Sequence, residues 1–188
     1  MTDREKYVPG PATGARVQKE GDKWTLILVR ELRHPPALVW EALTDPAQLT
    51  AWAPFDASRN LAAVGSVQLS TVGAPTPQVS ESTVKRAEAP RLLEYGWGGN
   101  DIRWELEPLG NGTRLTLWHN IERGFIAWGA AGWHVCLDVL ERALAGNPLG
   151  RIVGADAMKF SGWQQLMAEY SKQFGVEPPA WAPKTTKH

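Results

Sequence analysis

The sequence lacks the residues on which disulfide bonds, thiolate metal clusters and nucleic-acid binding depend. Cys136 is the only cysteine among the 188 residues, so the chain cannot form an internal disulfide or a cluster of thiolates. Lys plus Arg number 20, as do Asp plus Glu, so there is no basic excess to bind phosphate groups. No apolar stretch typical of a secretory signal follows the N-terminus, and no run approaches the roughly 18 apolar residues of a membrane span. We therefore expect a cytoplasmic protein without a membrane span and without a nucleic-acid partner.

Motifs typical of catalytic sites are missing as well. The sequence contains no pair of histidines at metal-binding spacing and no Cys/His cluster. It also contains no Gly-x-Ser-x-Gly, no phosphate-binding P-loop and no dinucleotide-binding Gly-x-Gly-x-x-Gly. We predict no metal, no cofactor and no hydrolase or oxidoreductase activity.

Tryptophan is the most abundant aromatic residue of the chain. There are 10 Trp against 4 Phe and 3 Tyr. Trp combines a large apolar ring system with one N–H that needs an acceptor, so it suits a wall that is partly wet. Two interpretations stay open: a cavity lined by aromatic rings, or a core that these rings fill.

The first two thirds of the chain have the pattern of an antiparallel sheet. Residues 24–32 form a β-rich run. Two short helices follow it, and the second starts at Asp45-Pro46, where Asp suits the N-cap and Pro the first helical position. Turn residues rather than helices separate the next predicted strands, which indicates antiparallel pairing. These strands cover residues 61–64, 65–71, 79–87, 92–97, 102–109 and 113–121.

The last third of the chain is predicted to be helical. Apolar residues from Trp133 to Leu144 recur at the helical period, within a helix over about 126–145. Another amphipathic helix follows Gly162 and ends at Gly175, a residue that favours a helix C-terminus. The long helix must bury its apolar stripe, and the concave face of the sheet is the only large apolar surface available to it.

These elements predict one α+β domain over residues 23–175, with an irregular lead-in over 1–22 and a loose tail over 176–188. In this domain a curved antiparallel sheet of six or seven strands wraps around the long C-terminal helix. Two short helices follow the first strand, and an extra helix follows the long one.

Two turn signals predict how the central strands pair. Asn111-Gly112 is a strong hairpin signal. With these two residues as the loop, the pairs are Leu106 with Leu117, Trp104 with His119 and Ile102 with Ile121. A second turn, Gly98-Gly99 or Gly99-Asn100, places Leu93, Tyr95 and Trp97 on the same apolar side. A shift of one residue would move all these side chains to the opposite face, so the pattern predicts the buried face. Trp118 is the one misfit, because it falls on the polar side.

Several stretches of this pattern resemble a known family. Residues 32–36 read Leu-Arg-His-Pro-Pro and lead into Val-Trp-Glu-Ala-Leu-Thr-Asp-Pro at 39–46, and residues 112–117 and 132–137 fit a final strand and a long helix. They resemble the C-terminal-domain-like group of the heat-shock protein 90 ATPase activator, within the START, polyketide-cyclase and pollen-allergen superfamily (SRPBCC). The resemblance covers roughly residues 24–145.

This resemblance implies a helix-grip fold, with a cavity between the sheet and the long helix. In the superfamily such a cavity commonly takes apolar or amphipathic small molecules. The activator has a further N-terminal domain for which this chain has no room, so we do not expect a chaperone partner.

Four polar residues are considered as candidate site residues. His119 is predicted to point inward, either as a core or rim histidine bonded to a carbonyl, or as a ligand partner or acid–base group. Arg30 shares a strand face with Leu26 and Leu28, so it needs a carboxylate partner within the protein or a ligand anion. His134 and Asp138 lie four residues apart on the long helix, where a pair on the solvent face is the simpler interpretation.

The ligand-binding residues that we predict lie on the inner face of the sheet and on the helix opposite. They are Tyr95, Trp97, Trp104, Leu106, Leu117, His119, Trp133, Leu137 and Arg30. We predict a protein without evident catalysis that carries, senses or sequesters an apolar or amphipathic small molecule. The alternatives are an enzyme of the cyclase or dehydratase kind that uses a pocket histidine, and an accessory domain that binds a protein partner. A homodimer stays open.

Overall fold

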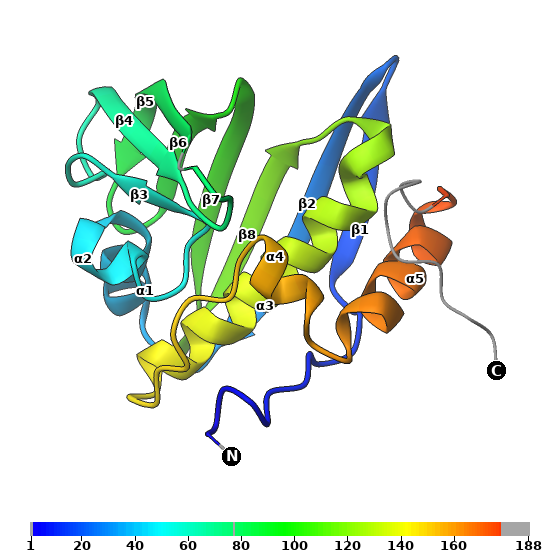
Figure 1. Ribbon diagram of the computed structural model, residues 1–188. Coiled ribbons are helices and arrows are strands. Elements are labelled where there is room, and N and C mark those ends of the chain that lie inside the picture. The colour runs from blue at the N-terminus through cyan, green and yellow to red at the C-terminus, as the bar shows by residue number, and fades with distance from the viewer. Residues whose placement is uncertain (1, 77, 178–188) are drawn as a thin grey trace, which may run out of the picture.

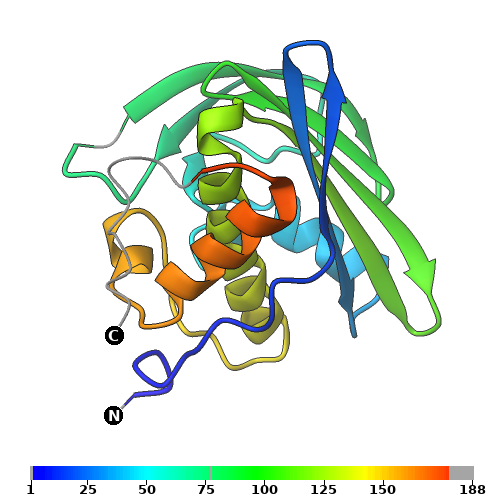
Figure 2. The same ribbon diagram turned by 90° about the vertical axis from the view of Figure 1, so that its right-hand side faces the viewer.

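A single curled antiparallel sheet dominates the computed structural model, which describes residues 2–76 and 78–177. The sheet has eight strands in the order β1-β2-β8-β7-β6-β5-β4-β3 within the described residues. It curves around the long helix α3 (Ile126–Leu144), as Figures 1 and 2 show. This arrangement is the predicted α+β helix-grip fold. The strands are β1 (Ala15–Glu20), β2 (Lys23–Leu32), β3 (Phe55–Ala57), β4 (Gly65–Thr71), β5 (Gln78–Glu88), β6 (Leu92–Trp97), β7 (Asn100–Leu109) and β8 (Gly112–Asn120).

The sheet has more strands than the six or seven predicted, because two short strands escaped the sequence pattern. Strand β1 lies within residues 1–22, where an irregular lead-in was predicted, and it pairs with β2 from Ala15 opposite Leu28 to Glu20 opposite Lys23. Most of its side chains are exposed and polar, so it has no apolar alternation to detect. It is held in the sheet by backbone pairing and by Ala15 and Val17, which are half-buried and pack against the core.

The segment 61–64 was wrongly predicted to be a strand. It is a turn-rich connection in which Leu61 is fully buried and its N–H donates to the carbonyl of Thr44. The strand in this part of the chain is β3, whose Phe55 pairs with Thr71 of β4. The prediction rested on a run of apolar residues before Gly65 that begins with the buried Leu61.

The pairing between β7 and β8 is shifted by two residues from the predicted register, because the loop begins one residue earlier. Leu109 pairs with Gly112, so the loop is Gly110-Asn111 rather than Asn111-Gly112. Gly110 has φ +59°, and no residue other than glycine has a positive φ among the described residues, which fits a type II′ turn with glycine first. A shift of two positions keeps every side chain on its face, so the predicted buried face is correct although the partners differ.

The hairpin between β6 and β7 follows the first predicted option. Trp97 pairs with Asn100 across a Gly98-Gly99 loop in which both glycines have positive φ, as a type I′ turn requires. Tyr95 consequently lies opposite Ile102. Trp118, the misfit on the polar face of β8, stacks under the guanidinium of Arg103 at 4.4 Å from the ring centroid.

The four predicted helices are present, and a short helix α4 (Ala155–Met158) lies between the last two without having been predicted. The predicted helices are α1 (Pro36–Thr44), α2 (Pro46–Leu49), α3 and α5 (Trp163–Phe174), with a 3₁₀ turn η1 (Arg123–Phe125) before α3. Asp45 caps α2 by accepting from the N–H of Ala47, and Gly175 ends α5 with φ +66°. No helix in the described part of the chain is long and apolar enough to cross a membrane.

Helix α3 is covered on two sides, which positions the candidate site. One side faces the concave sheet through residues such as Trp133 and Leu137, both buried. Helix α5 packs along α3 as well, as Figure 2 shows. Of the predicted loose tail, residues 178–188 lie outside the described part of the chain.

Candidate functional site

An aromatic cluster fills the middle of the concave face. Trp104 of β7 and Trp133 of α3 meet edge to face, with ring centroids 5.4 Å apart and planes at 84°. Trp104 is fully buried and its indole N–H donates to the Tyr95 hydroxyl over 3.0 Å. Trp104 and Tyr95 therefore form a fixed apolar wall with their polar atoms satisfied.

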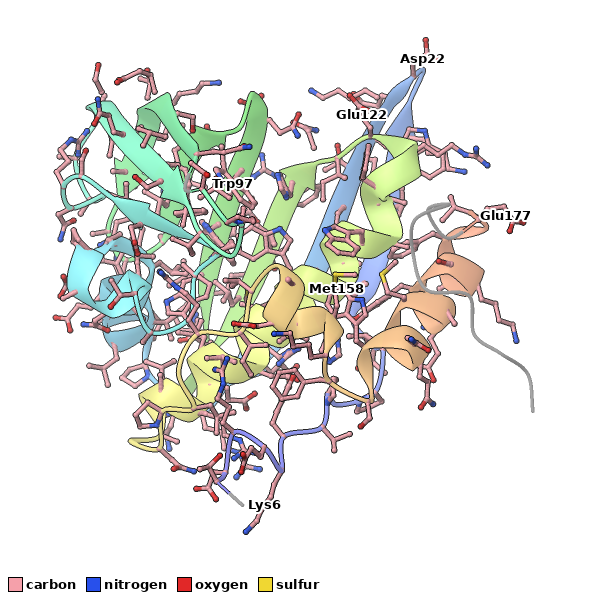
Figure 3. All side chains as sticks on the ribbon, viewed as in Figure 1. Lys6, Asp22, Trp97, Glu122, Met158 and Glu177 are labelled. Atoms are coloured by element: carbon pink, nitrogen blue, oxygen red, sulfur yellow. The ribbon has the colours of Figure 1, made fainter. Side chains whose placement is uncertain are left out.

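A cavity of about 280 Å³ lies next to this cluster. It opens between the ends of the central strands, the first half of α3 and the segment 152–163 that carries α4. Trp97 borders it from the sheet side, where Figure 3 labels it. Its lining is mostly aliphatic and aromatic, and the lining residues are Pro54, Thr71, Val72, Trp97, Asn100, His119, Ile121, Phe125, Trp128, Gly129, Gly132, Trp133, Cys136, Ile152, Val153, Gly154, Ala157 and Trp163.

His119 is the one imidazole in this lining, and its tautomer follows from a single contact. The indole N–H of Trp133 donates to Nδ1 of His119 over 2.9 Å. An indole nitrogen can only donate, so Nδ1 carries a lone pair and the proton of the neutral ring sits on Nε2. Nε2 is buried and has no hydrogen-bond partner among the described residues.

Burial keeps His119 neutral. The side chain is 5% exposed, and loss of solvation lowers its pKa to about 4. Trp97 stacks on the ring at a centroid distance of 5.8 Å. At neutral pH the imidazole that borders the cavity is therefore uncharged, and its Nε2–H is buried and unpaired among the described residues.

Two glycines of α3 border the cavity. A Cβ on Gly129 would meet Cδ1 of Ile121, the flexible end of that side chain, which would have to move aside. A Cβ on Gly132 would meet no atom within 4 Å. Glycine inside a helix is less stable than alanine by roughly 0.5–1 kcal/mol, so Gly132 keeps space open at a cost in stability.

The described lining of the cavity contains no activated nucleophile. Cys136 borders it, but burial raises the pKa of its thiol to about 12, so it stays protonated. No Asp, Glu, Lys or Arg is among the described lining residues. The imidazole of His119 thus has no carboxylate beside it with which to share acid–base work.

The predicted ligand-binding residues fall into four places. Trp97, His119 and Trp133 border the cavity. Tyr95 and Trp104 stand in the wall behind them, and the three leucines, Leu106, Leu117 and Leu137, are buried in the core. Arg30 borders a different cluster, described next. The sequence reasoning missed Trp128 and Trp163, for which the abundance of Trp was the only signal. It also missed the segment 152–154, for which the sequence contains no signal.

Arg30 belongs to a polar network on the side of α3 that faces β2 and the N-terminal segment. Its guanidinium contacts Oδ1 of Asp138 at 2.6 Å, the internal salt bridge that was one of the two expectations. The Tyr7 hydroxyl donates to the other oxygen of Asp138. Burial, reinforced by the Asp138 charge, raises the pKa of Tyr7. The network joins the N-terminal segment to β2 and α3.

The placement of His134 and Asp138 on the solvent face was wrong. His134 is 1% exposed, and its Nδ1 lies 2.7 Å from the Tyr170 hydroxyl of α5. Burial lowers its pKa. The helical pattern shows that this face differs from the Trp133 face, but it cannot show that α5 returns to cover it.

Comparison with known proteins supports this architecture. Residues 33–145, more than half of the chain, match the family described as Activator of Hsp90 ATPase homolog 1-like protein. No curated protein matches the chain. Among solved structures, CalU16 from Micromonospora echinospora is similar at 21% identity, with a TM-score of 0.60 over 85% of this chain and 94% of that one.

Two further structures share the fold. A conserved protein of unknown function from Enterococcus faecalis has a TM-score of 0.66 at 16% identity, covering 85% of this chain and 89% of its own. DynU16, from the dynemicin biosynthetic locus, has a TM-score of 0.59 at 23% identity, covering 70% of this chain and 50% of its own. At these identities the likeness concerns the fold.

Proposed function

Because the chain belongs to the Activator of Hsp90 ATPase homolog 1-like family, and its matched region supplies the sheet and helix that bound the cavity, we propose that it binds an apolar small molecule there. The role is to carry, sense or sequester that molecule. The carrying observation is a cavity of about 280 Å³ whose lining is mostly aliphatic and aromatic and includes several Trp rings. Small-molecule sites are typically apolar pockets with a few placed polar groups.

Gly132 is consistent with a space kept open for a ligand. A glycine inside a helix is less stable than alanine by roughly 0.5–1 kcal/mol, and a Cβ at position 132 would meet no atom within 4 Å. A packed core would place a methyl group at this position instead.

Binding accounts for the site better than catalysis does. Cyclase- or dehydratase-like acid–base chemistry would need a group near neutral pKa with a partner that exchanges protons with it. The pKa of His119 is lowered to about 4, and the described lining contains no carboxylate. We accordingly propose no turnover at this site.

A ligand titration with one cavity-filling variant tests the proposal. Naphthalene should bind the wild-type protein saturably in titration calorimetry, and Gly132→Leu should abolish this binding because the new side chain occupies the cavity. Gly124→Leu is the matched control, since a Cβ there also meets nothing within 4 Å but Gly124 is not among the lining residues. Absence of saturable binding to the wild type, or equal binding by both variants, would reject the proposal.

A further inference from the structure

We infer, resting on the proposed function, that Arg4 is a positioning residue of the cavity. It couples the N-terminal strap (residues 2–14) to the outer wall of the cavity (residues 149–163), so that ligand binding and order in the strap stabilise each other. Arg4 is not among the described lining residues, so it acts on the ligand through the outer wall.

The outer wall is the part of the cavity that regular secondary structure holds least. Its first stretch lies within residues 145–154, all of them described, which form neither a helix nor a strand. It also follows residue 145, where the match to the family ends. A ligand therefore rests partly against chain whose position depends on contacts with other segments. The outer wall contributes five lining residues, namely Ile152, Val153, Gly154, Ala157 and Trp163.

Arg4 holds the beginning of the outer wall by its backbone carbonyls. Its Nη1 donates to the carbonyl oxygens of Gly150 and Arg151, each over 2.8 Å, and lies 3.5 Å from that of Leu149. These three carbonyls directly precede Ile152 of the lining. A guanidinium is planar and presents its N–H donors in fixed directions, so carbonyls bonded to it are held in one arrangement. Arg4 thus fixes the backbone immediately before the lining.

The strap reaches the far end of the outer wall as well. Tyr7 donates to Asp138 of α3 and packs edge to face on Phe160, with ring centroids 5.6 Å apart. Pro9 packs on Gly162, where a Cβ would come within 2.6 Å of the proline Cδ. Figure 2 shows the strap, in dark blue, running past α5 to the start of β1. The strap consequently contacts both ends of the outer wall and is itself anchored on α3.

Arg151 holds the outer wall from another side, so loss of Arg4 loosens the wall without detaching it. The guanidinium of Arg151 contacts Oδ1 of Asp56 at 2.6 Å and donates to the carbonyl of Leu49 over 3.0 Å. A ligand that packs on the wall favours the position in which Arg4 reaches its carbonyls. Linkage requires the converse: Arg4, by favouring that position, raises the affinity for the ligand by the same factor.

Arg4→Gln tests the coupling, and Arg59→Gln is its matched control. Arg59 also donates to three backbone carbonyls, those of Asn60, Ala63 and Ser66, over 2.7, 3.0 and 2.9 Å. Both arginines are half-buried, and the loop that Arg59 holds is not among the described lining residues. In titration calorimetry Arg4→Gln should weaken naphthalene binding about fivefold, the lower end of coupling between two sites, while Arg59→Gln should leave the affinity unchanged.

Hydrogen exchange in the wild type measures the reciprocal effect and needs no variant to fold. By mass spectrometry, peptides from the strap should exchange more slowly at saturating naphthalene, whereas peptides from residues 58–66 should exchange at the same rate with and without it. A strap that only added stability would not respond to the ligand in this local way. Unchanged exchange in the strap, or equal affinities of Arg4→Gln and Arg59→Gln, would overturn the inference and leave the proposed function standing. Absence of naphthalene binding by the wild type would overturn both.

Discussion

Replacing Gly132 by alanine should stabilise the protein more than replacing Gly129 by alanine. The two sites are three residues apart in one helix, and both substitutions gain roughly 0.5–1 kcal/mol of intrinsic helix propensity. They differ in what the new methyl group meets. At Gly132 it meets nothing within 4 Å, whereas at Gly129 it overlaps Cδ1 of Ile121. Because the gain in helix propensity is the same at both sites, the difference in stability between the two variants reports what the new methyl group contacts.

The magnitudes follow from this difference. Gly132→Ala should raise the free energy of unfolding by about 0.5–1 kcal/mol, which corresponds to a Tm increase of about 1–4 °C for a domain of this size. Gly129→Ala gains the same helix propensity but must displace Cδ1 of Ile121, the flexible end of that side chain, so it should be less stable than Gly132→Ala. Gly132→Ala should also weaken naphthalene binding, because the methyl group occupies ligand space.

Urea denaturation of the three proteins, followed by circular dichroism, measures these changes. The reasoning is refuted if Gly132→Ala lowers the free energy of unfolding, because a methyl group placed in empty space has nothing to displace. It is equally refuted if Gly129→Ala is the more stable of the two variants.

Three further predictions concern buried polar groups. The pKa of His119 is lowered to about 4 from an unfolded value near 6.5, so the unfolded state binds more protons below pH 6.5; stability should fall by about 3 kcal/mol from pH 7 to pH 4, and His119→Gln should flatten that slope in urea titrations. Asp138→Asn removes the charge that pairs with Arg30 at 2.6 Å and should cost about 2 kcal/mol of unfolding free energy, because the pair is only partly exposed, while Asp101→Asn at an exposed pair should cost below about 1 kcal/mol. Cys136 should react with a thiol reagent at pH 8 only at the rate of unfolding, since burial raises its pKa to about 12, and reaction faster than unfolding would contradict this.

Local signals in the sequence sufficed for the fold. The helical period from Trp133 to Leu144 predicted α3, and Asp45 and Gly175 marked helix ends that the structure confirms. The strand β1 could not be predicted from such local signals, because it lies at the edge of the sheet and most of its side chains are exposed and polar. The predicted pairing of β7 with β8 failed by two positions, since the loop uses Gly110 rather than Gly112 for its positive φ.

The site was predictable in part, for a physical reason. Alternation along β6, β7 and β8 places Trp97 and His119 on the concave face, because neighbouring side chains point to opposite faces of a sheet. Nothing local shows that α5 covers His134, or that residues 152–154 return to border the cavity. Such contacts join segments far apart in the sequence, and a periodic pattern says only which face is buried.

The position of bound naphthalene on the protein is the most direct test of the proposed binding site. Isotope-filtered NOE spectra of ¹³C-labelled protein with unlabelled naphthalene should show contacts to the methyl groups of Ile121, Ile152 and Val153, which border the cavity. Contacts confined to the outer face of the sheet around Trp118, or none at saturating naphthalene, would contradict it.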